Sequence, residues 1–340
     1  MNKDYRKIFE TIENQQQTVL HKNSHVLLVD SLNTFLRSFV AIHHINPAGN
    51  HIGGLVGYLK SVGSVIKHLE PTRVVLVFDG QGGSTNKRYL YPEYKANRHI
   101  TKITNWEAFE TQEEESEAIT NQIIRLVDYL KCLPVDLVSI DKIEADDVIG
   151  YLAQQFPEKV TILSTDQDYI QLVSDNVSVF SPIKKTIYYP ETVMKEYGIP
   201  PHNFLTHKVV VGDKGDNVPG VKGIAIKTLV KLFPELKSSD KIGLNEILTK
   251  AEALPGKYRD IYNYRHQLAI NEQLMNLSEP NISEESKALL DRMVLNPRDN
   301  YDPSTFVKLC QEDRVEGSLK TPQLWLTETF SKLKDYKLQD

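Results

Sequence analysis

Four short aliphatic runs, separated by stretches of helical pattern, most constrain how this chain can fold. They are HVLLV (25–29), RVVLVF (73–78), VDLVSI (135–140) and VTILS (160–164). Short apolar runs bounded by turn residues are typical of buried strands, and strands that alternate with helices predict a parallel sheet. We therefore expect an α/β fold in which a mostly parallel central sheet is flanked by helices, with a short hairpin added by VSVFSP and KTIYYP.

Acidic residues follow these runs one after another. Asp30 ends the first run and Asp79 follows the second. Asp166 and Asp168 follow the fourth, and the helix after the third run opens with EADD (144–147). Because ligands of an open parallel sheet collect outside the carboxyl ends of its strands, we expect these carboxylates to meet at one edge. With GDKGDN (212–217) the candidate set has nine members: Asp30, Asp79, Glu144, Asp146, Asp147, Asp166, Asp168, Asp213 and Asp216.

This acidic set predicts a metal site. Carboxylates gathered at one edge cannot stay ionised without cations, because like charges raise one another's pKa. Oxygen donors with no nearby His or Cys suit Mg²⁺ or Mn²⁺ rather than Zn²⁺. Two such ions about 3.5–4 Å apart activate water and steady the leaving oxygen in phosphodiester hydrolysis. By helical spacing Glu144 and Asp147 share a face, and we expect Asp146 to point elsewhere, towards a second centre.

Each acidic residue also has a purely structural interpretation. A single Asp after a strand is often a turn or N-cap residue, and EADD at the start of a helix favours the helix dipole. These interpretations explain each residue singly, but they do not predict that all should lie at the same end of a sheet. We therefore favour the metal site.

A basic segment rich in tyrosine follows the second run. Residues 86–102 (NKRYLYPEYKANRHITK) contain five Lys or Arg, one acid and three Tyr. Here Lys and Arg would contact phosphates, and tyrosines would stack on unpaired bases. The alternative is an exposed basic loop with no partner.

A glycine-punctuated element forms the second strong signal. In GDKGDNVPGVKGIAIKTLVKLF (212–233) glycines permit tight turns, a helix is expected directly after Gly223, and Lys222, Lys227 and Lys231 add positive charge. A helix start behind such a turn binds anions, so the element predicts contact with a duplex phosphate backbone without reading of sequence. The alternative is a simple helical hairpin.

Composition narrows the class of protein. The chain of 340 residues suggests about two domains, and its net charge of −5 excludes a uniformly basic coat but not a local basic patch. No apolar run is long enough for a membrane span, and the first residues lack the apolar core of a secretory signal. Two cysteines, Cys132 and Cys310, fit a reducing compartment, and we expect a cytoplasmic protein.

Six motifs in this order resemble those of the structure-specific 5′ nucleases, which include phage 5′→3′ exonucleases and flap endonucleases. They are VDS, VFDG, YPEYKANR, IEADDVIG, STDQDYIQL and GDKGDNVPGVKGI, and they span about residues 25–235. The YRKIFE leader, TNWEAF and Tyr262–Leu268 resemble more loosely the branch of the T-even phage ribonuclease H.

The resemblance implies roles for individual residues. The first metal region would involve Asp30, Asp79, Glu144, Asp146, Asp166 and Asp168, and the second Asp147, Asp213 and Asp216. Lys95 and Arg98 would contact the scissile phosphate from a helical arch, Tyr94 would stack on a base, and Arg88 would add a phosphate contact. Gly220–Gly223 would lie in a helix-three-turn-helix that grips duplex DNA, with K⁺ as a further ion.

The domain organisation follows from these motifs. We expect a polar leader (1–24), an α/β nuclease domain (25–205) with a basic arch at about 84–118, a helical DNA-binding subdomain (206–290) with its helix-three-turn-helix at 209–233, and a helical C-terminal segment (291–340) of unknown role.

The expected function is Mg²⁺-dependent hydrolysis of phosphodiesters at 5′ ends, with Mn²⁺ as a substitute ion. The enzyme would remove RNA primers or flaps during lagging-strand replication. Its partner would be flap, nicked or RNA-primed duplex DNA, with a single-strand DNA-binding protein or a sliding clamp as a further partner, and the chain would act as a monomer. The alternatives are an RNA-processing ribonuclease with a similar acidic edge and a non-catalytic DNA-end binding protein.

Overall fold

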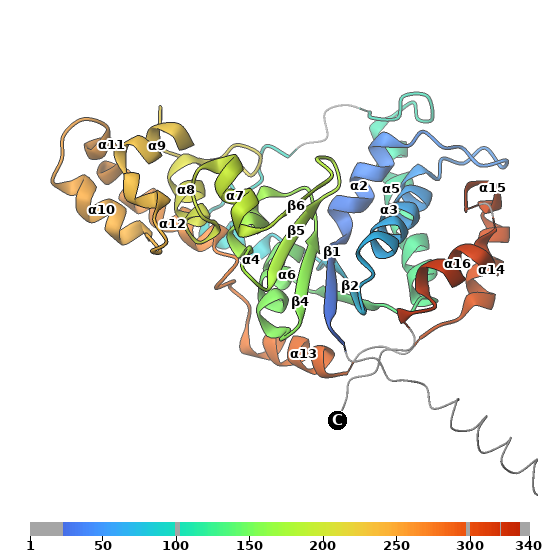
Figure 1. Ribbon diagram of the computed structural model, residues 1–340. Helices are drawn as coiled ribbons and strands as arrows, with labels where there is room; N and C mark the ends of the chain where they lie inside the picture. The colour runs from blue at the N-terminus through green and yellow to red at the C-terminus, as the bar shows by residue number, and fades with distance from the viewer. Residues whose placement is uncertain (1–22, 99–102, 297–299, 320, 334–340) are drawn as a thin grey trace, which may run out of the picture.

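A six-stranded sheet lies at the centre of the molecule (Figure 1) in a computed structural model that describes residues 23–98, 103–296, 300–319 and 321–333. The strand order is β3-β2-β1-β4-β5-β6, and all neighbours are parallel except β5 and β6. The strands are β1 (His25–Asp30), β2 (Arg73–Asp79), β3 (Asp136–Ile140), β4 (Lys159–Leu163), β5 (Val177–Ser181) and β6 (Thr186–Tyr188). The prediction of a mostly parallel sheet is confirmed, including the hairpin at its edge.

The chain reverses its direction across the sheet at β1. It runs from β1 outwards through β2 to β3, then returns to place β4 on the other side of β1. Such a reversal between neighbouring parallel strands opens a crevice at their carboxyl ends, where ligands of these folds bind. Asp30 ends β1 at this point, and Asp166 follows β4.

Two hydrophobic cores cover the two faces of the sheet. Successive residues of β1 alternate between them: Leu27 and Val29 pack into one core, Val26 and Leu28 into the other. The first core contains α2 (Ser31–Ala41), α3 (Gly53–Leu69), α5 (Gln112–Lys131), α14 (Pro303–Glu312), α15 (Glu316–Leu319) and α16 (Pro322–Phe330). The second contains α6 (Ala145–Gln155), α7 (Pro190–Tyr197), the helical region that follows it, and α13 (Glu284–Leu295).

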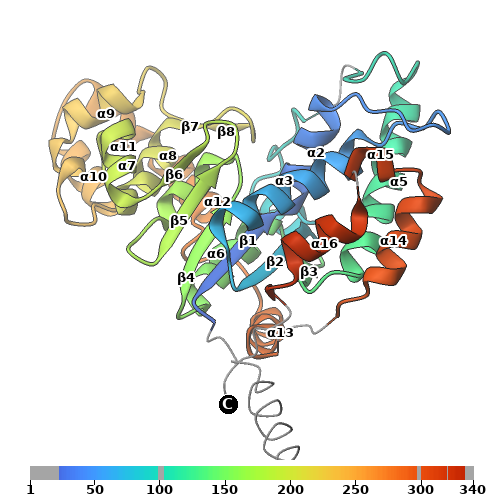
Figure 2. The same ribbon diagram turned by 45° about the vertical axis from the view of Figure 1, so that its right-hand side comes forward.

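A helical region follows the sheet and lies on the side of β6 (Figures 1 and 2). It comprises α8 (Phe204–Val211), the two-stranded hairpin β7 (Gly212–Asp213) and β8 (Val218–Pro219), α9 (Ile226–Leu232), α10 (Leu244–Glu252), α11 (Lys257–Asn263) and α12 (Arg265–Met275). Gly220 is required here, since a Cβ atom would lie 1.9 Å from the carbonyl oxygen of Val211. The helix expected directly after Gly223 begins three residues later, at Ile226.

In its described residues, the segment expected as an arch (84–118) contains the short helix α4 (Thr85–Leu90), turns over 92–97, and the start of α5 at Gln112. Residues 99–102 of this segment, residues 1–22 of the expected leader, and 297–299, 320 and 334–340 of the C-terminal segment lie outside the described residues. The described C-terminal helices pack on the first core, where Phe306 contacts Tyr129 and Trp325 with ring centroids 5.1 and 5.8 Å apart. No helix in the described ranges has the length and apolarity that crossing a bilayer requires.

Candidate active site

Asp30 joins β1 to α2 and is 8% exposed. Its side chain caps α2 by accepting a hydrogen bond from the backbone N–H of Asn33, at 3.3 Å. The hydroxyls of Ser164 and Tyr169 donate to its other oxygen, at 3.0 and 3.3 Å. The N-cap interpretation is therefore true of Asp30, and it does not exclude a second role, because the capping oxygen is not the one that these hydroxyls contact.

Asp79 lies at the end of β2, the strand next to β1, and therefore at the same edge of the sheet as Asp30. Its Oδ1 accepts a hydrogen bond of 2.9 Å from the backbone N–H of Ala145, the first residue of α6. This bond holds the start of α6, and with it Glu144, against the carboxyl end of β2. The EADD motif thus lies at the edge where Asp30 and Asp79 lie.

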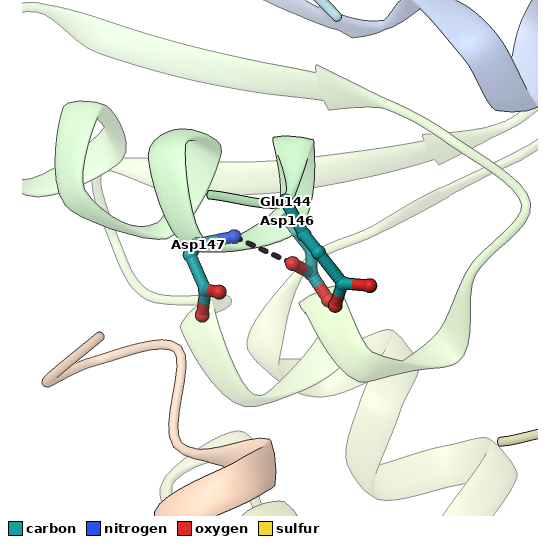
Figure 3. Close-up of side chains that lie close together, drawn as sticks. All are labelled: Glu144, Asp146 and Asp147. Atoms are coloured by element: carbon teal, nitrogen blue, oxygen red, sulfur yellow. Dashed lines mark hydrogen bonds between the residues drawn. The ribbon is translucent and has the colours of Figure 1, made fainter. Parts of the chain in front are cut away.

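Glu144, Asp146 and Asp147 offer ligand atoms that all lie within 4.8 Å of one another (Figure 3). Our expectation that Asp146 points away was wrong. Glu144 is the N-cap of α6, with the extended dihedrals φ −76° and ψ 153°, so helical periodicity does not govern its direction. The Lys87 ammonium lies 3.0, 3.2 and 3.1 Å from Glu144, Asp146 and Asp147 respectively.

Asp166 and Asp168 follow β4 at the start of a short 3₁₀-helix, Gln167–Leu172, with Asp168 inside the helix and Asp166 directly before it. Asp166 caps that helix by accepting from the backbone N–H of Asp168, at 2.9 Å. The Lys208 ammonium lies 2.7 Å from Asp168 and also pairs with Asp213. Lys208 therefore connects the acidic edge of the sheet to the β7–β8 hairpin.

The second hairpin carboxylate, Asp216, meets the basic segment. Lys95 has a left-handed φ of 56° and donates its backbone N–H to the carbonyl of Asp216, at 2.8 Å. Its ammonium lies 2.5 Å from Glu144 and 4.0 Å from Asp216. The Arg98 guanidinium pairs with Asp216. Both predicted cations thus lie at the carboxylate cluster in this structure.

Tyr94 does not fit the stacking role that we expected. Its ring is 3% exposed, and its hydroxyl donates to Glu144 at 2.9 Å and to Asp216 at 3.1 Å. Tyr94 is buried because the chain folds back onto the cluster at Lys95. In this arrangement Tyr94 orients carboxylates rather than presenting a face to a base.

Burial and mutual repulsion raise the pKa values of several of these carboxyl groups. Burial raises the pKa of Asp30 to about 7, against the hydrogen bond from Ser164. Burial does the same for Asp147 and Asp168, both at about 7, and for Asp166, at about 6. Glu144 differs from these groups. Burial favours its neutral form and raises its pKa, but the charges of Lys87 and Lys95 outweigh burial and lower the pKa to about 2. The site holds one firm anion and several carboxyl groups that would ionise readily once a cation is near.

The donor chemistry fits hard divalent cations. All candidate ligands are carboxylate oxygens, which suit Mg²⁺ or Mn²⁺. Glu144, Asp146 and Asp147 could hold one ion directly, and Asp30, Asp79, Asp166 and Asp168 lie at the ends of the adjoining strands. The elevated pKa values are a second sign of fit, because they result from negative charge crowded where ordinary solvation is missing.

Two lysines at this site were missed from the sequence as site residues. Lys87 and Lys208 are each 9% exposed, and each contacts two or more of the carboxylates. Lys87 lies in the same basic segment as Lys95, and this proximity in sequence was the feature that could have identified it as a site residue. Lys208 carries no local signal, because its position depends on how α8 packs against the 3₁₀-helix after β4.

The expected nucleic-acid residues of the hairpin region lie apart from this ionic network. Lys222, Gly223 and Lys227 are exposed, and Gly220 packs against the end of α8. Gly223 has a left-handed φ of 76° with open space where a side chain would be, and its carbonyl accepts from Lys257, at 3.1 Å. Arg88 is exposed on α4.

Comparisons with known proteins agree with this geometry. A family model described as the 5′-3′ exonuclease, N-terminal resolvase-like domain, matches residues 25–198. The 5′-3′ exonuclease of Bacillus subtilis (strain 168) is 33% identical over 232 residues, which cover 65% of this chain and 73% of that protein. The 5′-3′ exonuclease of Buchnera aphidicola subsp. Acyrthosiphon pisum (strain APS) is 30% identical over 261 residues, 76% of this chain and 85% of that protein.

A solved structure shares the fold. The bacteriophage T5 flap endonuclease, crystallised as a pseudo-enzyme-product complex with DNA and metal ions, matches with a TM-score of 0.61 at 21% identity, covering 87% of this chain and 100% of that chain. With the family model over half of the chain and two curated relatives matched over most of their length, this chain belongs to the 5′-3′ exonuclease family, whose members hydrolyse phosphodiester bonds.

Proposed function

We propose that this chain is a Mg²⁺-dependent 5′-3′ exonuclease and flap endonuclease that hydrolyses phosphodiesters near 5′ ends on duplex DNA. One observation carries the proposal: carboxylates that follow β1, β2 and β4 and open α6 gather at the crevice where the chain reverses across the sheet. The family's activity and the DNA and metal ions in the T5 flap endonuclease complex support it.

The chemistry assigned to the chain is positioning and charge control. Bound divalent ions would lower the pKa of water and neutralise charge on the scissile phosphate. Glu144, with its lowered pKa, would remain ionised to hold an ion, and the hydroxyl of Tyr94 would keep it oriented. Lys95 and Arg98, which pair with carboxylates in this structure, would give those bonds to phosphate oxygens when substrate enters.

The remaining parts of the proposal concern substrate and setting. Exposed Lys222 and Lys227 beside Gly220 and Gly223 would contact the duplex backbone within a helix-three-turn-helix at 209–233, with K⁺ as a further ion there. The enzyme would remove RNA primers or flaps during lagging-strand replication in the cytoplasm, as a monomer with a single-strand DNA-binding protein or a sliding clamp as a further partner. The proposed boundaries are those of the nuclease domain (25–205), the DNA-binding subdomain (206–290) and the C-terminal segment (291–340).

The test compares labelled flap, nicked and RNA-primed duplexes with Mg²⁺ and with EDTA. We expect 5′ cleavage that requires Mg²⁺ and is lost in Asp79→Asn and Asp166→Asn. The DNA affinity of both variants should stay within a few fold of the parent's. Asp175→Asn is the matched control, because Asp175 is exposed and precedes β5 at the opposite end of the strands. Full activity in Asp79→Asn, or cleavage that persists in EDTA, would contradict the proposal.

A further inference from the structure

A basic groove without carboxylates lies between α2, α3 and the turn that joins β5 to β6. Its volume is about 500 Å³, and an adjoining hollow of about 320 Å³ shares Arg37 and Ser61 with it. Lys185 and His68 line the groove, and Lys60 lines the hollow. None of the described residues lining either space is Asp or Glu. We call this place the Arg37 groove.

Arg37 is only partly satisfied by its surroundings. Its Nη2 donates to the hydroxyl of Ser61, at 3.2 Å. Its Nε is buried and has no hydrogen-bond partner among the described residues, and no carboxylate of the described chain pairs with the guanidinium. Burial lowers the pKa of Arg37 with no acidic neighbour to offset it. A guanidinium without a carboxylate partner keeps Nη–H groups that can donate to a bound oxyanion.

Two other arginines of the described chain, one buried and one half-buried, pair with carboxylates. Arg73 donates to Asp136 at 2.8 Å and to the carbonyls of Met293 and Val294. Arg125 pairs with Glu312 and Asp313, at 2.7 and 2.8 Å. Arg37 differs from these two arginines because no carboxylate among the described residues pairs with its guanidinium.

The groove opens beside the acidic edge of the sheet. Arg37 lies six residues beyond Ser31, the first residue of α2, which is roughly 9 Å along the helix. The turn that carries Lys185 follows the carboxyl end of β5, so it projects from the same edge as Asp30 and Asp166. Figures 1 and 2 place α2 and α3 on one side of the sheet and α8 and α9 on the other.

We propose that Arg37, Ser61 and Lys185 bind a backbone phosphate of the nucleic-acid substrate, outside the catalytic edge and on the side away from the β7–β8 hairpin. The two Nη groups of Arg37 would donate to phosphate oxygens, which is a forked geometry that guanidinium groups favour. The Ser61 hydroxyl lies within reach of the same position, and Lys185 adds charge from the opposite wall. The inference rests on the proposed function for the identity of its ligand.

The test measures affinity for a fluorescein-labelled 5′-flap duplex by anisotropy in EDTA, so that cleavage plays no part. We expect Arg37→Gln with Lys185→Gln to raise Kd about tenfold and to reduce the slope of log Kd against log salt by about one to two. Arg37→Lys keeps the positive charge but not the forked pair of N–H donors, so its Kd should lie between that of the parent and that of the double variant. All variants should unfold at the parent's temperature to within about 2 °C.

Arg292→Gln is the matched control, because Arg292 is exposed on α13 at the far end of the sheet. A Kd within twofold of the parent in the double variant, or an equal loss in Arg292→Gln, would overturn the proposal. The alternative ligand of the Arg37 groove is a free phosphate ion in place of a backbone phosphate of DNA. If inorganic phosphate at constant ionic strength raises the parent's unfolding temperature through Arg37 while the double variant binds DNA normally, the assignment to a backbone phosphate is overturned. Cleavage by the parent in Mg²⁺ is scored separately and tests the proposed function alone.

Discussion

Asp30→Asn should stabilise the folded protein when no divalent ion is present, and the gain should depend on pH. Burial raises the pKa of Asp30 to about 7 from an ordinary 3.8. One pKa unit corresponds to about 1.36 kcal/mol, so an ionised Asp30 costs the folded state about 4 kcal/mol above pH 7. The penalty is absent below about pH 4, where the group is protonated in both states, and it grows as pH rises to 7. An Asn at this position carries no charge and escapes it.

Urea unfolding in EDTA at pH 5 and pH 8 measures this effect. The free energy of unfolding of Asp30→Asn should gain about 2–3 kcal/mol on the parent between these two pH values. Any loss of hydrogen bonding to Ser164 or Tyr169 is independent of pH and cancels in that difference. Saturating Mg²⁺ should reverse the order, because only the parent keeps the full ligand set. A stability difference that does not change with pH, or that falls as pH rises, would contradict a raised pKa of Asp30 in the folded protein.

Three further variants probe the same cluster. Lys87→Met leaves three carboxylates without their shared ammonium, so the free energy of unfolding in EDTA should fall by about 3 kcal/mol, with partial recovery in Mn²⁺; an unchanged urea midpoint would contradict this. Tyr94→Phe removes a donor to two carboxylates, so the free energy of unfolding should fall by about 1.5–3 kcal/mol. If the ring of Tyr94 does not stack on a base, fluorescence anisotropy should show that Tyr94→Phe loses no more DNA affinity than Tyr94→Trp. Gly220→Ala places a Cβ atom 1.9 Å from the last carbonyl of α8, so DNA affinity should fall about tenfold while the far-ultraviolet circular dichroism of the sheet persists; normal affinity would show that the hairpin does not contact DNA.

The sheet and its acidic edge could be predicted because both follow from short-range pattern. Buried parallel strands such as VLLV and VVLVF are recognisable in isolation, and a rule of topology then brings their ends together. Asp30, Asp79 and Asp166 needed no further information. The comparisons confirm the family that the ordered motifs indicated.

Other features depend on tertiary packing and carry no such pattern. Helical periodicity does not predict the direction of Glu144, because Glu144 is the N-cap of α6. The position of that N-cap depends on the hydrogen bond from the backbone N–H of Ala145 to Asp79. Tyr94 is turned inward by the left-handed backbone of Lys95, a conformation that a lysine rarely adopts. Lys208 reaches Asp168 only because α8 packs on the 3₁₀-helix after β4, a contact between segments forty residues apart.

Crystals grown with Mn²⁺ and measured at the manganese absorption edge would show whether the carboxylates at the ends of the strands bind two divalent ions. We expect two anomalous peaks about 3.5–4 Å apart at the carboxylate edge, the first coordinated by oxygens of Glu144, Asp146 or Asp147. Both peaks should weaken in Asp79→Asn crystals. Manganese bound only at exposed carboxylates elsewhere, with Lys87 still occupying the cluster, would contradict this expectation.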